Sequence, residues 1–84
     1  MITAVAIKVN DKVYSLPRPA RHADVVKFFR IKWNDPQVEG FLDNDSEFVD
    51  RVEAMQIAKK CNQPLIDFWH DLDAAAELYS ENLW

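Results

Sequence analysis

The chain has 84 residues, of which 49% are hydrophobic and 12% are aromatic, and its formal net charge is −4 at pH 7. A chain of this length forms a single domain over residues 1–84, and its hydrophobic content excludes a disordered protein. With one cysteine it has no intramolecular disulfide and no cysteine zinc site. With one glycine it lacks the glycine-rich phosphate loops of nucleotide-binding enzymes.

The charges are divided unevenly along the chain. Residues 1–33 carry seven Lys and Arg against two acids, a net charge of +5, whereas residues 34–84 carry three against twelve acids, a net charge of −9. This asymmetry has two interpretations. Either the basic part attracts an anionic partner, or the two parts attract each other within the fold.

No segment suits a membrane or a secretion signal. The apolar N-terminal run ends at Lys8, well short of the roughly 20 apolar residues that cross a bilayer. A lone cysteine fits a reducing compartment. We therefore expect a cytoplasmic protein without membrane contact.

The first part of the chain predicts a hairpin and a helix. Residues 4–9 and 12–16 are rich in β-branched side chains, and the Asn-Asp pair between them suits a tight turn. The prolines that follow can open a helix from about residue 20 to residue 33. Its stripe of apolar residues contains His22, Val25, Val26, Phe29 and Trp33.

A second hairpin and a second helix are predicted next. Residues 40–42 and 47–49 read as short strands around a polar turn. Asp50 followed by Glu53 is typical of a helix start, and Asn62 can end that helix. Cys61 falls on its apolar side, where we expect a small buried side chain and no reactive thiol.

The C-terminal part is predicted to dock on the rest of the fold. Residues 65–78 can form a third helix, and an apolar end with Leu83 and Trp84 gains from burial. The predicted fold class is therefore α+β. A small antiparallel sheet, made from the N-terminal hairpin and a short second hairpin, is covered by two or three helices.

Arg18, Arg21 and His22 form the candidate ligand site, because they stand where the first predicted helix begins. Helix N-termini favour anions, and two guanidinium groups can grip a phosphate or a carboxylate. Tyr79, Ser80 and Glu81 could line the same pocket or merely anchor the tail. In the alternative interpretation, the arginines pair with the acidic part of the chain and His22 packs in the core.

The sequence gives less support to catalysis, to metal binding and to binding of nucleic acid. His22 could act as a general base if Glu81 folded back to orient it, but we assign no catalytic residue. Asp67, His70 and Asp71 have a spacing that a metal could use, although a solvated face is favoured, so neither metal nor cofactor is expected. A pI near 5.0 argues against binding of duplex nucleic acid.

The chain resembles a family of small proteins encoded by tailed bacteriophages and prophages. The resemblance covers most of the chain and rests on these segments: Ser15-Leu16-Pro17-Arg18-Pro19-Ala20-Arg21-His22, Gly40-Phe41-Leu42, Phe48-Val49-Asp50-Arg51, Glu53-Ala54, Ile57-Ala58, and Leu78-Tyr79-Ser80-Glu81 with Leu83-Trp84. Family members often have a second histidine where this chain has Ala23, and Gly-Gln where it has Asn62-Gln63. Chemistry that needs paired histidines is therefore in doubt for this chain.

The resemblance implies a phage accessory protein acting in the bacterial cytoplasm. Our leading hypothesis is a non-enzymatic protein that binds a host protein or a small anionic ligand, in host takeover or counter-defence. One alternative is a small enzyme that acts on a phosphorylated or nucleotide substrate through Arg18, Arg21 and His22. Another is a structural, self-assembling component whose tryptophans form the interface. The sequence does not set the oligomeric state.

Overall fold

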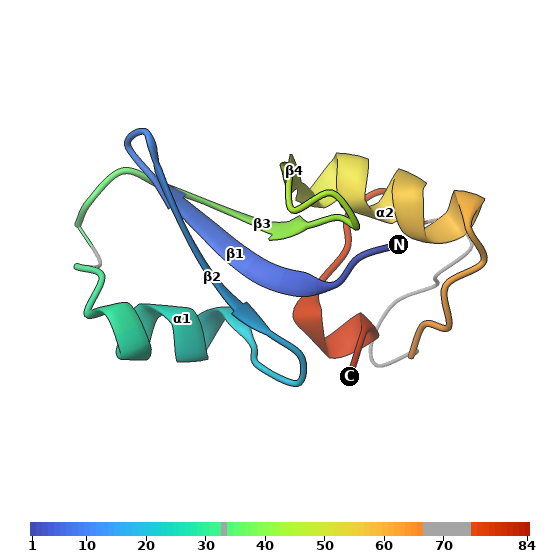
Figure 1. The fold of residues 1–84 in the computed structure, drawn as a ribbon, viewed down its shortest axis with the longest axis horizontal. Helices are drawn as coiled ribbons and strands as arrows, with labels where there is room; N and C mark the ends of the chain where they lie inside the picture. The colour runs from blue at the N-terminus through green and yellow to red at the C-terminus, as the bar shows by residue number, and fades with distance from the viewer. Residues whose placement is uncertain (33, 67–74) are drawn as a thin grey trace.

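The computed structural model describes residues 1–32, 34–66 and 75–84. Within them the elements follow in the order β1 (Ala4–Val9), β2 (Lys12–Pro17), α1 (His22–Phe29), β3 (Gln37–Leu42), β4 (Phe48–Asp50), α2 (Arg51–Lys60) and the 3₁₀ turn η1 (Ser80–Asn82). Figure 1 shows the strands between the two helices. The α+β class with a small antiparallel sheet is confirmed.

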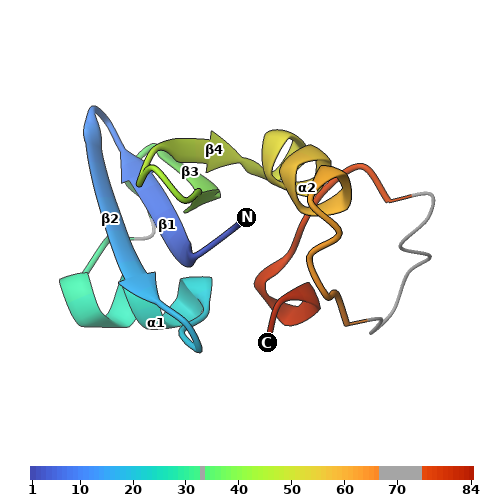
Figure 2. The ribbon, with the colours of Figure 1, turned by 45° about the vertical axis from the view of Figure 1, so that its right-hand side comes forward.

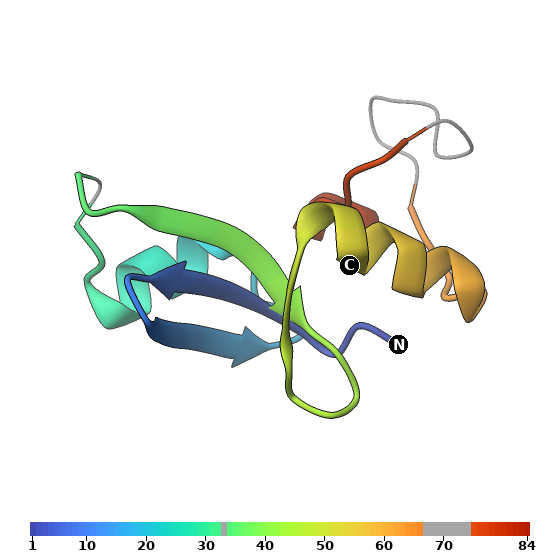
Figure 3. The same cartoon turned by 90° about the horizontal axis from the view of Figure 1, so that it is seen from above.

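The sheet has the strand order β2-β1-β3-β4, and every neighbouring pair is antiparallel. Strands β2 and β3 therefore run in the same direction on either side of β1, and the connection between them passes through α1. Helix α1 packs against β1 and β2, whereas α2 contacts β3 and β4. Figures 2 and 3 show the two helices at opposite ends of the molecule.

The first hairpin has the predicted tight turn. Val9 pairs with Lys12 and leaves Asn10 and Asp11 as the loop. Asn10 has a φ of 55°, which is left-handed backbone that asparagine tolerates better than most residues. The turn fixes the register of the two strands, and so decides which of their side chains face α1.

The core lies between the sheet and α1. The register aligns Leu16, Val5 and Phe41 across three strands, and Val25 of α1 is also fully buried. Residues of α2 and of the C-terminal segment complete this cluster, which comprises Ile2, Val5, Ile7, Val25, Phe41, Val49, Ala54, Met55, Leu78 and Leu83.

Helix α1 is shorter than predicted, because it ends at Phe29 and does not reach residue 33. Arg30 adopts a φ of 56°, which breaks the helical path, and the N–H of Ile31 donates to the carbonyl of Val26. This is the usual left-handed way of ending a helix. Trp33 lies outside the described residues.

Helix α2 begins as predicted, since the Asp50 carboxylate accepts a 2.8 Å hydrogen bond from the Glu53 N–H. Asn62, beyond its last turn, has a φ of 55°, which is left-handed backbone that asparagine tolerates better than most residues. The predicted burial of Cys61 is wrong. Cys61 follows the end of α2 and is exposed, because the chain leaves the helical path there and the apolar face stops at Ala58.

The predicted third helix falls mostly on residues 67–74, which lie outside the described residues. Its described ends, 65–66 and 75–78, are not helical. The predicted docking of the C-terminal segment is confirmed, because Leu78 and Leu83 are buried in the core. Gln63 ties the N-terminus to the same region, accepting from the Ile2 N–H at 2.7 Å and donating to the Ile2 carbonyl at 3.0 Å.

Gly40 is the point of closest approach between β3 and β4. A Cβ at this position would lie 2.3 Å from the Val49 carbonyl oxygen and 2.6 Å from the Phe48 ring. We predict that Gly40→Ala lowers the free energy of unfolding by about 1–3 kcal/mol, as overpacking does. Urea unfolding measures this loss. Val38→Ala, at an exposed position of the same strand, should change stability by about 0.5 kcal/mol or less.

Candidate functional site

The start of α1 lies against the C-terminal segment. One Nη of Arg21 donates to the Trp84 carbonyl oxygen, and the other lies 3.7 Å from the Glu81 carboxylate. The indole N–H of Trp84 donates to the Ala20 carbonyl at 2.7 Å. The Arg18 guanidinium lies 5.5 Å from the centre of the Trp84 ring. The two arginines are thus held by groups of the protein itself.

His22 is a buried part of the core and is only 7% exposed. Its Nε2 donates a 2.7 Å hydrogen bond to the Gly40 carbonyl, and its ring meets the Phe41 ring edge-on at 5.0 Å. Because a carbonyl only accepts, Nε2 must carry the hydrogen, and Nδ1 of the neutral ring is bare. That Nδ1 lies 4.0 Å from the Glu39 carboxylate, beyond hydrogen-bond range.

Burial lowers the pKa of His22 below its ordinary value of 6.5, because desolvation penalises the imidazolium. The nearby Arg51 adds to this effect. The bond to the Gly40 carbonyl and the carboxylates of Glu39 and Glu81 oppose it, but do not overcome it. His22 is therefore neutral at pH 7 and contributes no charge to the arginine cluster.

A second set of polar contacts joins β3 and α2 to the C-terminal segment. Arg51 donates to the Glu39 carboxylate, and its guanidinium lies 4.6 Å from the centre of the Tyr79 ring. The Tyr79 hydroxyl donates to Glu77 at 3.3 Å, and the Arg51 carbonyl accepts from the Leu78 N–H at 3.0 Å. These contacts hold the tail against the start of α2.

Sequence reasoning missed Glu39 and Arg51. The alternation along β3 did carry a signal, because Glu39 shares the inward face with Phe41. A carboxylate on an apolar face must be paired with a cation or a hydrogen-bond donor, because burying an unpaired charge is costly. That the partner would be Arg51, on a different element, follows only from the pairing of β3 with β4.

The structure brings most of the predicted site residues together, and their side chains contact groups of the protein itself. Arg18, Arg21 and Glu81 meet around Trp84, and Ser80 is buried with its hydroxyl 3.3 Å from the Glu81 carboxylate. Tyr79 belongs to the Arg51 contacts. Arg21 and Glu81 match the interpretation in which the basic and acidic parts attract each other. Ligand binding by these residues stays a prediction.

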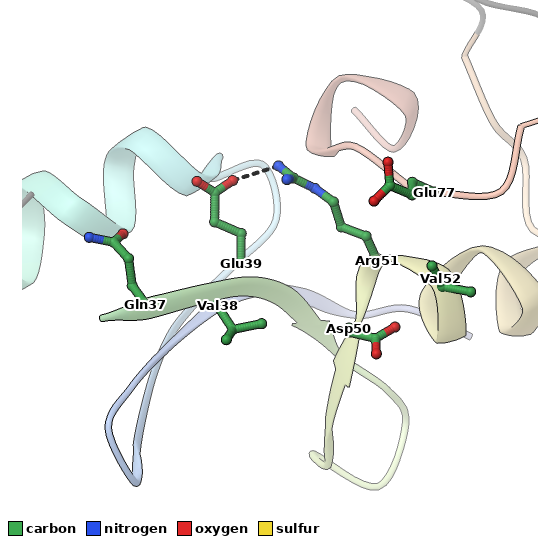
Figure 4. A pocket seen from close by; sticks show the side chains of 7 residues that line it. All are labelled: Gln37, Val38, Glu39, Asp50, Arg51, Val52 and Glu77. Atoms are coloured by element: carbon green, nitrogen blue, oxygen red, sulfur yellow. Dashed lines mark hydrogen bonds and ion pairs between the residues drawn. The ribbon is translucent and has the colours of Figure 1, made fainter. Parts of the chain in front are cut away.

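A pocket of about 410 Å³ opens on the other side of Arg51. Its lining residues are Gln37, Val38, Glu39, Asp50, Arg51, Val52 and Glu77. Figure 4 shows Glu39 and Arg51 pointing toward each other, with Val38 directed to the opposite side of β3. The pocket lining contains three carboxylates and one guanidinium, and two of these groups, Glu39 and Arg51, form an ion pair. None of the six predicted ligand residues lines it.

The described ranges contain neither a cluster of metal ligands nor a helix that could span a membrane. In residues 1–32, 34–66 and 75–84, no group of three or more His, Cys, Asp or Glu could hold a metal ion. In the same ranges no helix has the length and apolarity that crossing a bilayer requires. The predicted weak metal spacing, Asp67, His70 and Asp71, lies outside the described residues.

Fold and site together define a small α+β domain whose charged cluster is paired internally. Over residues 1–84 the chain matches the family described as Phage T4 y16D protein. It therefore belongs to this family of small phage proteins, as the sequence resemblance predicted. Searches of curated proteins and of solved structures found no match.

The lowered pKa of His22 predicts a pH-dependent stability. Between the folded pKa and 6.5 the unfolded chain binds more protons at this residue than the folded chain does. The stabilisation from neutral His22 is therefore present above pH 6.5 and is lost as the pH falls through the folded pKa. Urea unfolding at pH 7.5 and pH 5 measures this loss.

His22→Gln is the matched control, because its amide can donate to the Gly40 carbonyl without titrating. We expect this variant to lose less stability than the wild type between the two pH values. The carboxylates of the chain titrate in both proteins, so their contribution to the loss of stability cancels in the comparison. Equal losses in the two proteins would contradict a depressed pKa for His22.

Proposed function

We propose that this phage protein is a non-catalytic binding protein that acts on a host protein in the bacterial cytoplasm, in host takeover or in countering host defence. One observation carries the proposal. At the start of α1, Arg21 is engaged by Glu81 and Trp84 of the C-terminal segment, while large apolar side chains such as Phe28, 69% exposed, are open to solvent. Such a surface favours binding over catalysis.

An enzyme built on His22 is less well supported. A general base needs a nitrogen within reach of a substrate proton, yet Nε2 is bound to the Gly40 carbonyl and the ring is almost fully buried. Arg21, which would hold a phosphate, already contacts the Trp84 carbonyl. A substrate would have to displace the protein's own groups from both side chains.

Binding of a small anion is the second candidate, and one observation favours it. The Nη1 of Arg21 is buried and makes no hydrogen bond, although Glu81 lies 3.7 Å away. An anion could satisfy that nitrogen. It would compete with a carboxylate that is already in place, so a protein partner remains the better-supported proposal.

Affinity capture with chemical crosslinking from a bacterial lysate tests the main proposal. We expect the protein to retain a discrete host protein at both low and physiological salt. The control bait is an unrelated acidic domain of similar size, which reports non-specific capture. If the protein retains nothing beyond what the control bait retains at either salt concentration, the proposal is wrong.

Titration with inorganic phosphate, followed by NMR of the arginine side chains, separates the two candidates. Because Glu81 and Trp84 occupy Arg21, we expect no saturable shift of the Arg21 resonances. A saturable shift in the wild type that disappears in Arg21→Gln would instead establish the anion site. Arg30→Gln is the matched control, because Arg30 lies at the other end of α1.

A further inference from the structure

A run of three aromatic rings, one from β2 and two from the end of α1, reaches into solvent. The rings of Tyr14 and Phe29 lie 5.1 Å apart, and those of Phe29 and Phe28 lie 4.9 Å apart. Tyr14 packs against the core, Phe29 is 37% exposed and Phe28 is 69% exposed. Exposure to solvent thus increases along the run, from the partly buried Tyr14 to Phe28. Its inner ring is fixed by packing, which positions the outer rings before any partner arrives.

Two cations are near neighbours of Phe28 in the sequence, at the end of α1. Lys27 and Arg30 are exposed, and neither takes part in any of the ion pairs or ring contacts found in residues 1–32, 34–66 and 75–84. The acid of α1, Asp24, stands in the first turn, where its carboxylate accepts from the Arg21 N–H at 2.8 Å. We call Tyr14, Lys27, Phe28, Phe29 and Arg30 the aromatic-cationic patch.

The patch differs from the basic cluster at the start of α1. There, Arg18 and Arg21 are engaged by the C-terminal segment. At the end of the helix, Lys27 and Arg30 take part in no ion pair within residues 1–32, 34–66 and 75–84, and they belong to the part of the chain, residues 1–33, whose net charge is +5. The charge complementary to this surface is negative, so the partner that it favours is acidic.

We propose that the aromatic-cationic patch is the docking surface for an acidic protein partner. Apolar side chains of the partner cover Phe28 and Phe29, and its carboxylates pair with Lys27 and Arg30. Aromatic residues and arginine are enriched among the residues that contribute most to protein interfaces. The inference rests on the proposed function, to which it adds the surface and the chemical class of the partner.

The probe is a synthetic peptide in which glutamate alternates with leucine, with a second peptide carrying lysine in place of glutamate. Both are titrated into the ¹⁵N-labelled protein and followed by NMR. We expect the acidic peptide to shift the amide signals of residues 27–30 saturably, and its affinity to fall as salt is added. The lysine peptide should shift none of them.

Two variants test the patch directly. Phe28→Ser should weaken binding of the acidic peptide at least about tenfold. Lys27→Glu combined with Arg30→Glu should abolish it and create binding of the lysine peptide. All three substituted side chains are exposed, so the fold should persist, and the spectrum of each variant verifies this. Val52→Ser and Lys60→Glu, at exposed positions of α2, are the matched controls and should bind as the wild type does.

Several results would overturn the inference. They are equal binding of both peptides, shifts confined to other residues, and unchanged binding by Phe28→Ser. Tighter binding of single-stranded DNA to the same amides would reassign the patch to nucleic acid. A mass that rises with concentration in the wild type, but not in Phe28→Ser, would assign it to a second copy of the chain.

Failure of this inference is distinguishable from failure of the proposed function. If Phe28→Ser captures the same host protein from lysate as the wild type does, the protein is a binding protein but the patch is not its docking surface. If the wild type captures nothing, the proposed function fails whatever the peptides do.

Discussion

Gly40 is the constraint on which the arrangement of the elements depends. Its carbonyl accepts the hydrogen bond from the buried His22 ring, which ties the start of α1 to β3. Its missing side chain lets the Phe48 ring and the Val49 carbonyl come close on the other side, which brings β4 against β3. Gly40 therefore contacts both the start of α1 and strand β4. Helix α2 begins at the residue after β4, so its position also depends on this packing.

The fold brings the basic and acidic parts of the chain into contact, since Arg21 meets Glu81. Part of the positive charge is neutralised within the fold, where Arg21 meets Glu81 and Arg51 meets Glu39. The Arg21–Glu81 pair fastens the C-terminal segment to the start of α1. At the start of α2 the segment is held by the Arg51–Tyr79 contact and by the hydrogen bond from the Leu78 N–H to the Arg51 carbonyl. Partly exposed pairs of this kind contribute little to stability on their own. Their importance lies in the position that they give the segment, since Leu78 and Leu83 beside them are buried.

Local patterns were reliable wherever the decisive chemistry is local. The Asn10-Asp11 turn and the Asp50 cap were predictable because each depends on one side chain and its neighbouring backbone. The end of α1 was not predictable. The apolar stripe continues past Phe29, and it is the left-handed backbone of Arg30 that ends the helix. Cys61 was misplaced for a similar reason, because periodicity does not reveal where a helix stops.

The sequence by itself determined the α+β class, the two hairpins and the membership of a phage family, and it placed Arg18, Arg21 and His22 where α1 begins. Only the tertiary structure decided what those residues do. In the tertiary structure Arg21 contacts Glu81 and Trp84, His22 is buried against Gly40, and Phe28 is exposed to solvent. The physical reason is that hydrogen bonds and ion pairs act over a few ångströms, whereas the chain brings their partners from about 20 to 60 positions away.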